Sequence, residues 1–198
     1  MRQDDLFSHK QIRVKEMKRK TAKEILAESF RELAEKKKVD KITVRDITEN
    51  CGYSTTTFYR HFKDKYDLIV WEHTQYVSEI MDRVGKDGYS WNQTLYEGME
   101  YYEKNKEYLA NLLRHTTGYD SFIRNMAEIN FVALKERVMK AAKVDKLDEE
   151  TEIYIRFYCW GTTALNCEWI LGEYSISPRE LARMHETALP KPLHKYLY

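Results

Sequence analysis

Glycine and proline are scarce in this chain, and their scarcity limits the folds that it can form. The 198 residues include seven glycines and three prolines, whereas 33% are charged and 42% are hydrophobic. Sheet proteins need many turns, which rely on glycine and proline, so this composition favours long helices. The chain is also long enough to bury a substantial core without disulfides or metals. We therefore expect an all-α protein.

Helix-start signals recur along the chain at spacings typical of a helical protein. Thr21 with Glu24 and Ser177 with Glu180 have the spacing of capping boxes, in which each side chain bonds the other residue's backbone N–H. Glycines follow several of the predicted segments, where they can end a helix. We expect about nine helices and no strand, at residues 21–37, 43–51, 55–62, 65–84, 91–105, 107–115, 121–143, 148–171 and 177–189.

The near-neutral net charge of +1 hides two halves of opposite sign. Residues 1–68 contain 17 Lys and Arg against 12 Asp and Glu, a net +5, and the remaining 130 residues contain 16 against 20, a net −4. A basic N-terminal module on an acidic body indicates contact with DNA phosphates, although solvated helix faces would give the same count. Charge counts alone therefore do not distinguish DNA contact from solvated helix faces, and the sequence motifs are needed.

The segment from residue 43 to residue 62 has the pattern of a helix-turn-helix. A short helix with Val44 and Ile47 facing inward precedes Gly52, where a left-handed backbone costs little, and a second short helix buries Phe58 and Phe62. Three threonines, Thr55 to Thr57, lie in the first turn of the second helix, where a recognition helix meets base edges. Phenol, imidazole and ammonium groups follow at Tyr59, His61 and Lys65, and can bind phosphates.

The stretch KITVRDITENCGYSTTTFYRHFKDKYDL, residues 41–68, resembles the DNA-binding signature of the TetR/AcrR family of transcription regulators. The resemblance implies a three-helix DNA-binding domain at residues 19–68 with the helix-turn-helix at 43–62. It implies a helical ligand-binding and dimerisation domain at 69–198. Residues 1–18 are polar, and we expect them to form an arm or a helix extension. The resemblance also implies that Thr43 and Tyr59 contact phosphates, that Arg45, Thr55 and Thr56 face bases, that Thr57 contacts base or backbone, and that His61 and Lys65 hold the DNA backbone.

A second resemblance covers part of the C-terminal region. The stretch WGTTALNCEWILGEYSISPRELA, residues 160–182, is similar to the penultimate and last helices of a TetR subgroup that includes dihydroxyacetone kinase regulators. That subgroup also carries a stretch like KDKYDLIVW, residues 63–71. The resemblance adds transcriptional activation as an alternative to repression, and it implies nothing about the effector.

The expected helix at 148–171 is apolar around much of its circumference. One stripe can pack in the core of the subunit while another meets a second copy, as in a two-fold four-helix interface with the last helix. The alternative is that both stripes are internal. For the dimer interface we predict Ile155, Tyr158, Trp169, Ile170, Leu181 and Met184.

Aromatic residues crowd the C-terminal two thirds, where tyrosine dominates. Such side chains can line a cavity for a small-molecule effector, or they can be ordinary core. For effector binding we predict Tyr101, His115, Phe122, Phe131, Phe157 and Trp160.

No motif indicates an enzyme, because the chain has no G-x-S-x-G, no glycine-rich phosphate loop and no H-E-x-x-H. We predict no cofactor and no metal, since the three cysteines are scattered and no histidines are paired at ligand spacing. No apolar run reaches the roughly 18 residues that span a membrane. We expect a cytoplasmic, homodimeric repressor that binds a pseudo-palindromic operator and responds to an effector. An effectorless DNA-binding or protein-docking regulator is a further alternative.

Overall fold

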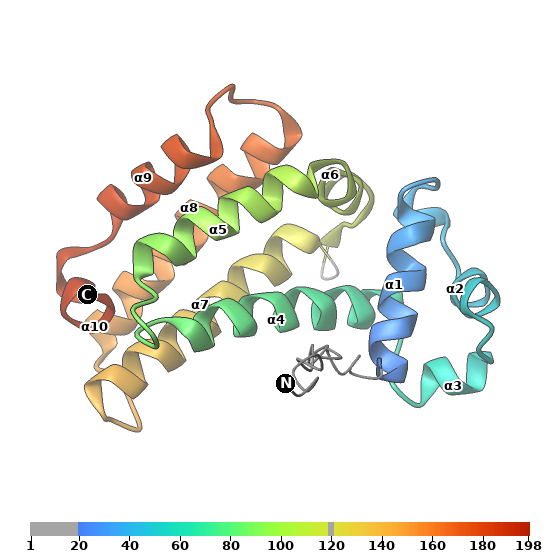
Figure 1. The fold of residues 1–198 in the computed structure, drawn as a ribbon, viewed down its shortest axis with the longest axis horizontal. Coiled ribbons are helices and arrows are strands. Elements are labelled where there is room, and N and C mark those ends of the chain that lie inside the picture. Colours follow the sequence, from blue (N-terminus) through green and yellow to red (C-terminus); the bar gives the residue numbers. More distant parts are fainter. Residues whose placement is uncertain (1–19, 119–120) are drawn as a thin grey trace, which may run out of the picture.

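A computed structural model of the chain describes residues 20–118 and 121–198. Over these residues it has ten α-helices, one 3₁₀ helix and no strand, which confirms the all-α prediction. Figure 1 shows a small head at one end of an elongated helical body. The head contains α1 (Ala22–Ala34), the 3₁₀ helix η1 (Val39–Lys41), α2 (Val44–Cys51) and α3 (Thr55–Tyr59). The predicted arm at residues 1–18 lies outside the described residues.

The body contains the longer helices. They are α4 (Lys65–Arg83), α5 (Trp91–Lys104), α6 (Lys106–His115), α7 (Phe122–Ala142), α8 (Glu149–Leu171), α9 (Pro178–Ala188) and α10 (Lys191–Leu197). Helix α4 runs from the head along the body and packs against α7, which in turn packs against α8 (Figure 1). Helix α9 covers α5 on the outside of the bundle. None of the helices in the described ranges is long and apolar enough to cross a membrane.

The predicted caps account for most helix boundaries. Thr21, Thr43 and Ser177 each form a complete capping box, and Ser90 forms another with Gln93. Gly52 ends α2 in the left-handed region at a φ of 74°, which most residues with a Cβ adopt only at a cost. The sequence-based helix starts are therefore confirmed to within a residue or two.

The predicted helix ends are less accurate. Helix α1 ends at Ala34 rather than at residue 37, and α3 ends at Tyr59 rather than at 62, because the N–H groups of His61 and Phe62 both bond the Phe58 carbonyl in a tight last turn. The structure also adds α10, which lies after the last helix that the sequence predicted. Pro192 lies in the first turn of α10, where a proline needs no N–H partner.

A single core cluster runs through the head and the body. In the head, α1, α2, α3 and the start of α4 bury Leu26, Phe30, Ile47, Phe58 and Leu68 completely. The Ser29 hydroxyl inside this core donates to the Ile47 carbonyl at 2.6 Å, so α1 and α2 are joined by a buried hydrogen bond. The head is therefore a packed unit that can present its outer surface in a fixed geometry.

Candidate functional site

Helix α3 lies at the outer edge of the head, with α1 between α2 and the body (Figure 1). Its buried anchor is Phe58, and Ser54 caps its first turn by accepting from the Thr57 N–H. Thr55 and Thr56 are exposed, and the Tyr59 side chain is 61% exposed. One face of this short helix thus fixes it to the head, and the opposite face carries hydroxyl and methyl groups into solvent.

Helix α2 adds a charged side chain to the same end of the head. Arg45 is exposed, and its Nε donates to Glu49 Oε1 at 2.7 Å, which leaves the rest of the guanidinium open to solvent. Thr43 begins the helix, and its hydroxyl and N–H both bond Asp46. A hydrogen bond from Lys37, followed by those from Thr43, lowers the pKa of Asp46 to about 2. The start of α2 is therefore rigidly held.

In the structure, Lys65 bonds backbone carbonyls of its own chain, and its predicted contact with the DNA backbone stays a prediction. Its ammonium donates to three carbonyl oxygens, those of Val39, Asp40 and Ile42, at 2.8, 3.1 and 2.8 Å. An ammonium has three donors, so this geometry uses all of them within the protein. Lys65 joins the start of α4 to the loop before α2 and positions the helix-turn-helix. His61 is half-buried beside the end of α3.

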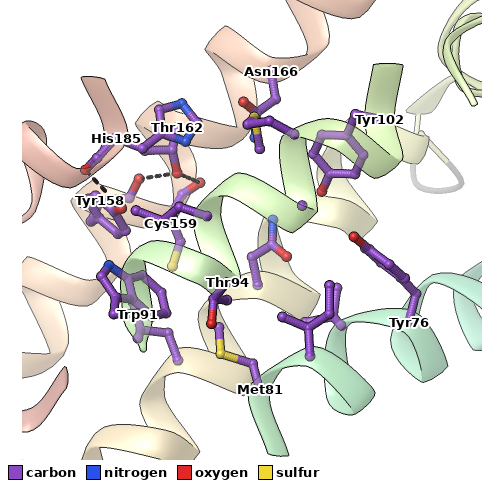
Figure 2. Close-up of a pocket in the computed structure, with 17 residues that line it drawn as sticks. Tyr76, Met81, Trp91, Thr94, Tyr102, Tyr158, Cys159, Thr162, Asn166 and His185 are labelled. Atoms are coloured by element: carbon purple, nitrogen blue, oxygen red, sulfur yellow. Dashed lines mark hydrogen bonds between the residues drawn. The ribbon is translucent and has the colours of Figure 1, made fainter. Parts of the chain in front are cut away.

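The body contains a pocket of about 100 Å³ between α4, α5, α7, α8 and α9 (Figure 2). Apolar side chains form most of its wall, namely Val77, Ile80, Met81, Leu95, Met99 and Leu134. Tyrosine, asparagine, threonine and histidine side chains supply the polar groups, and the lining contains no Lys, Arg, Asp or Glu. This combination is typical of a site for a small organic ligand.

None of the six residues predicted to bind an effector lines this pocket, so that prediction is wrong for this cavity. Phe122 and Phe131 are buried elsewhere in the core, and Tyr101 accepts a hydrogen bond from Arg31. The others are at the surface: His115 lies 3.8 Å from Asp40, and Phe157 and Trp160 are exposed. Aromatic content alone does not say which ring faces a cavity. Lining residues outside the predicted effector set include Tyr76, Trp91, Tyr102, Asn130, Asn166 and His185.

The predicted dimer residues also need correction. Five of the six, all except Met184, are buried within the subunit: Ile155, Tyr158, Trp169, Ile170 and Leu181. The large apolar side chains that α8 exposes are instead Ile153, Phe157, Trp160 and Leu165, and Met184 on α9 is exposed too. The Phe157 side chain is 75% exposed. We call these five residues the α8–α9 apolar face.

A polar network joins the head to the body. The Arg31 guanidinium of α1 donates to Glu72 Oε1 of α4 at 3.0 and 2.8 Å, and to Asn105 at 2.6 Å and the Tyr101 hydroxyl at 3.0 Å. The buried Tyr108 hydroxyl donates to the other Glu72 oxygen. The pKa of Tyr108 is raised, chiefly by burial, so its hydroxyl stays protonated and donates at neutral pH. The head therefore docks on α4, α5 and α6 through specific polar contacts.

A second link runs from α6. The Asn111 side-chain amide donates to the carbonyls of Ala34 and Lys37, and its oxygen accepts from the Val39 N–H. These bonds satisfy backbone groups just after α1. The ring of Tyr76, which lines the pocket, stacks on Tyr101 at 3.7 Å between centroids. The pocket is therefore two side chains away from Arg31 of the head.

Two buried histidines predict a pH dependence of stability. Burial lowers the pKa of His73 and of His185 to about 4, against about 6.5 in an unfolded chain. Between these values the unfolded state binds more protons, so the free energy of unfolding falls as the pH falls, by about 2 kcal/mol per histidine from pH 7 to pH 5. Urea denaturation at the two pH values measures this loss. If the double variant His73→Leu/His185→Leu loses as much free energy of unfolding between pH 7 and pH 5 as wild type does, the role of the two histidines is contradicted. His194→Gln is the control, because His194 is exposed.

Comparison with known proteins agrees with the geometry. A helical head that exposes a capped recognition helix, carried on a larger helical body, defines a helix-turn-helix DNA-binding protein. Two family models match the chain: "Bacterial regulatory proteins, tetR family" over residues 25–70, and "Transcriptional regulator C-terminal region", of the TetR type, over 89–191. The chain belongs to the TetR family and is a DNA-binding transcriptional regulator. The comparisons give no indication of an enzyme.

Solved structures show the same fold at low sequence identity. The dihydroxyacetone kinase operon activator DhaS is 18% identical with a TM-score of 0.62, over 89% of this chain and 98% of the other. A TetR regulator from Rhodococcus sp. RHA1 is 17% identical with a TM-score of 0.62, over 84% and 94%. The repressor AlkX from Dietzia sp. strain DQ12-45-1b, implicated in n-alkane biodegradation, is 16% identical with a TM-score of 0.54, over 91% and 100%. No curated protein sequence matches the chain.

Proposed function

We propose that the protein is an effector-responsive repressor that binds a pseudo-palindromic operator as a homodimer. The observation that carries this proposal is the exposed face of α3, where Thr55, Thr56 and Tyr59 stand on a fully packed head. The threonines read base edges in the major groove, and Arg45 of α2 adds a guanidinium group for the bases. Hydroxyl and imidazole groups for the DNA backbone come from Thr43, Thr57, Tyr59 and His61. The protein acts in the cytoplasm, where bacterial DNA is accessible.

Mobility shifts on an operator selected from random duplexes test this surface. Arg45→Ala, Thr55→Ala and Tyr59→Phe should each weaken binding about 5- to 100-fold, because each removes one contact worth about 1–3 kcal/mol. Tyr174→Phe is the matched control, since it removes a hydroxyl from an exposed tyrosine of the body. If all three head variants bind like wild type, the assigned surface is wrong.

Dimerisation through the α8–α9 apolar face completes the proposal. Exposed aromatic and aliphatic side chains on two helices favour burial against a second copy of the chain. Two heads are needed because a pseudo-palindromic operator presents two half-sites about one turn of DNA apart. The five predicted interface residues that are buried within the subunit pack α8 and α9 onto the core and so hold this face in position.

We further infer that the pocket holds the effector, and that the effector changes the separation of the two heads. The stack of Tyr76 on Tyr101, and the bond of Tyr101 to Arg31, offer a route from the pocket to the head. Activation is the second candidate. It is supported by the similarity to DhaS, whose name describes an operon activator, together with the stretch at residues 160–182.

A further inference from the structure

The pocket in the body contains polar atoms that the protein leaves unpaired. The Tyr76 hydroxyl, Asn166 Oδ1 and His185 Nε2 are buried and have no hydrogen-bond partner among the described residues. These three side chains come from α4, α8 and α9 and line the same pocket. Figure 2 shows the Tyr76 and Tyr102 hydroxyls directed toward its interior. Because an unpaired buried polar group costs free energy, such a convergence in one pocket indicates a ligand that supplies the partners.

The lining restricts the charge of that ligand. No acidic or basic side chain lines the pocket, and burial lowers the pKa of His185 to about 4, so this histidine is neutral at physiological pH. A charged molecule would lose its hydration without gaining an opposite charge. The Asn166 oxygen accepts a hydrogen bond, whereas the Tyr76 hydroxyl donates or accepts. A hydroxyl group on the ligand supplies both complements.

A glycine keeps part of the space open. Gly98 lies in the middle of α5 and lines the pocket, and a Cβ added there would meet nothing within 4 Å. Glycine inside a helix costs about 1 kcal/mol relative to alanine, so neither helix stability nor crowding favours it at this position. An alanine would project its methyl group into unfilled space. Gly98 therefore keeps part of the pocket volume open.

We propose that the pocket binds a compact, uncharged molecule with at least one hydroxyl group on an apolar frame. An apolar cavity of about 150 Å³ takes up benzene, so a pocket of about 100 Å³ holds about four non-hydrogen atoms as it stands, and about seven if its methionines move aside. The size class is that of butanol, cyclohexanol or phenol. This inference rests on the proposal that the pocket is the effector site, and it names the chemistry of the effector.

Calorimetric titration of the full chain, without DNA, tests the class of ligand. The probes are phenol, cyclohexanol and 1-butanol, with toluene and cyclohexylammonium as partners of similar size that lack the hydroxyl or carry a charge. At least one hydroxyl probe should bind, and phenol should bind about tenfold more tightly than toluene. The proposal is overturned if none of the three hydroxyl probes binds, if toluene binds as well as phenol, or if cyclohexylammonium binds more tightly than cyclohexanol.

Variants show whether binding occurs in this pocket. Asn166→Leu should raise the unfolding temperature of the free protein and reduce the preference for phenol over toluene, because it removes an unpaired oxygen. Gly98→Ala should also raise the unfolding temperature and weaken phenol binding at least severalfold. Thr74→Val is the matched control, since Thr74 lies on α4 outside the pocket lining and its hydroxyl already donates to the Val70 carbonyl at 2.8 Å. Unchanged phenol binding in Asn166→Leu and Gly98→Ala would overturn the proposal. Operator binding is measured separately, so this failure would leave the DNA-binding function standing.

Discussion

Phe157→Asp should convert the dimer into monomers and lower operator affinity by at least about 100-fold. The Phe157 side chain is 75% exposed in the subunit, so its replacement leaves the fold of the monomer intact. At a two-fold interface the change acts twice. Each copy loses about 1.5–3 kcal/mol of apolar burial and brings an unpaired carboxylate into the contact. Operator affinity falls because a monomer holds only one half-site.

Light scattering coupled to size-exclusion chromatography measures the oligomeric state, and mobility shifts on the selected operator measure affinity. Val144→Asp is the control, because Val144 is an exposed apolar side chain outside the α8–α9 apolar face. Its variant should remain a dimer. A Phe157→Asp protein that is still dimeric at the wild-type concentration would show that the interface lies on another surface.

Glu72→Ala should destabilise the protein by about 3 kcal/mol. Glu72 accepts hydrogen bonds from Arg31 and from Tyr108, and both ions of the Arg31–Glu72 pair are mostly buried, with 27% and 19% of the side chains exposed. Removal of the Glu72 carboxylate leaves the desolvated Arg31 guanidinium without its counter-charge and the buried Tyr108 hydroxyl without its acceptor, which costs more than the pair itself contributes. Because this network joins the head to the body, the loss should be seen in global unfolding.

Urea denaturation gives the free energies. Glu49→Ala is the matched control, because its pair with Arg45 is exposed on both sides and should contribute less than about 1 kcal/mol. Glu72→Gln keeps one acceptor oxygen, which serves either Arg31 or Tyr108 but not both, so its stability should fall between those of wild type and Glu72→Ala. Equal stability of the Glu72→Ala and Glu49→Ala proteins would contradict the role assigned to the network.

The sequence predicted well what local chemistry determines. The capping boxes at Thr21, Thr43 and Ser177 form between residues three apart, so their geometry is encoded in short segments. The turn at Gly52 is equally local. The outward face of α3 followed from its buried anchor Phe58, because on so short a helix one buried side chain sets the orientation. Fold class and the helix-turn-helix were therefore predictable.

Features that depend on tertiary packing could not be predicted from the sequence. Helix α8 is apolar around much of its surface, so periodicity alone could not say whether Ile155 or Phe157 faces the core, and the prediction assigned the two stripes the wrong way round. The pocket needs side chains from five helices, and its polar residues are separated by long stretches of sequence. Lys65 resembled a phosphate ligand, but the three carbonyls that it binds lie more than twenty residues earlier in the chain. Only the packed structure reveals such partners.

We expect the head to bind DNA through phosphate contacts around a sequence-reading helix. Fluorescence anisotropy of the wild-type protein on the selected operator and on a scrambled duplex, between 50 and 200 mM salt, tests it most directly. Despite a net charge of +1, operator affinity should fall by about three orders of magnitude over this range, while binding stays about 1,000-fold or more tighter on the operator than on the scrambled duplex. A flat salt response, or equal affinity for the two duplexes, would contradict the claim.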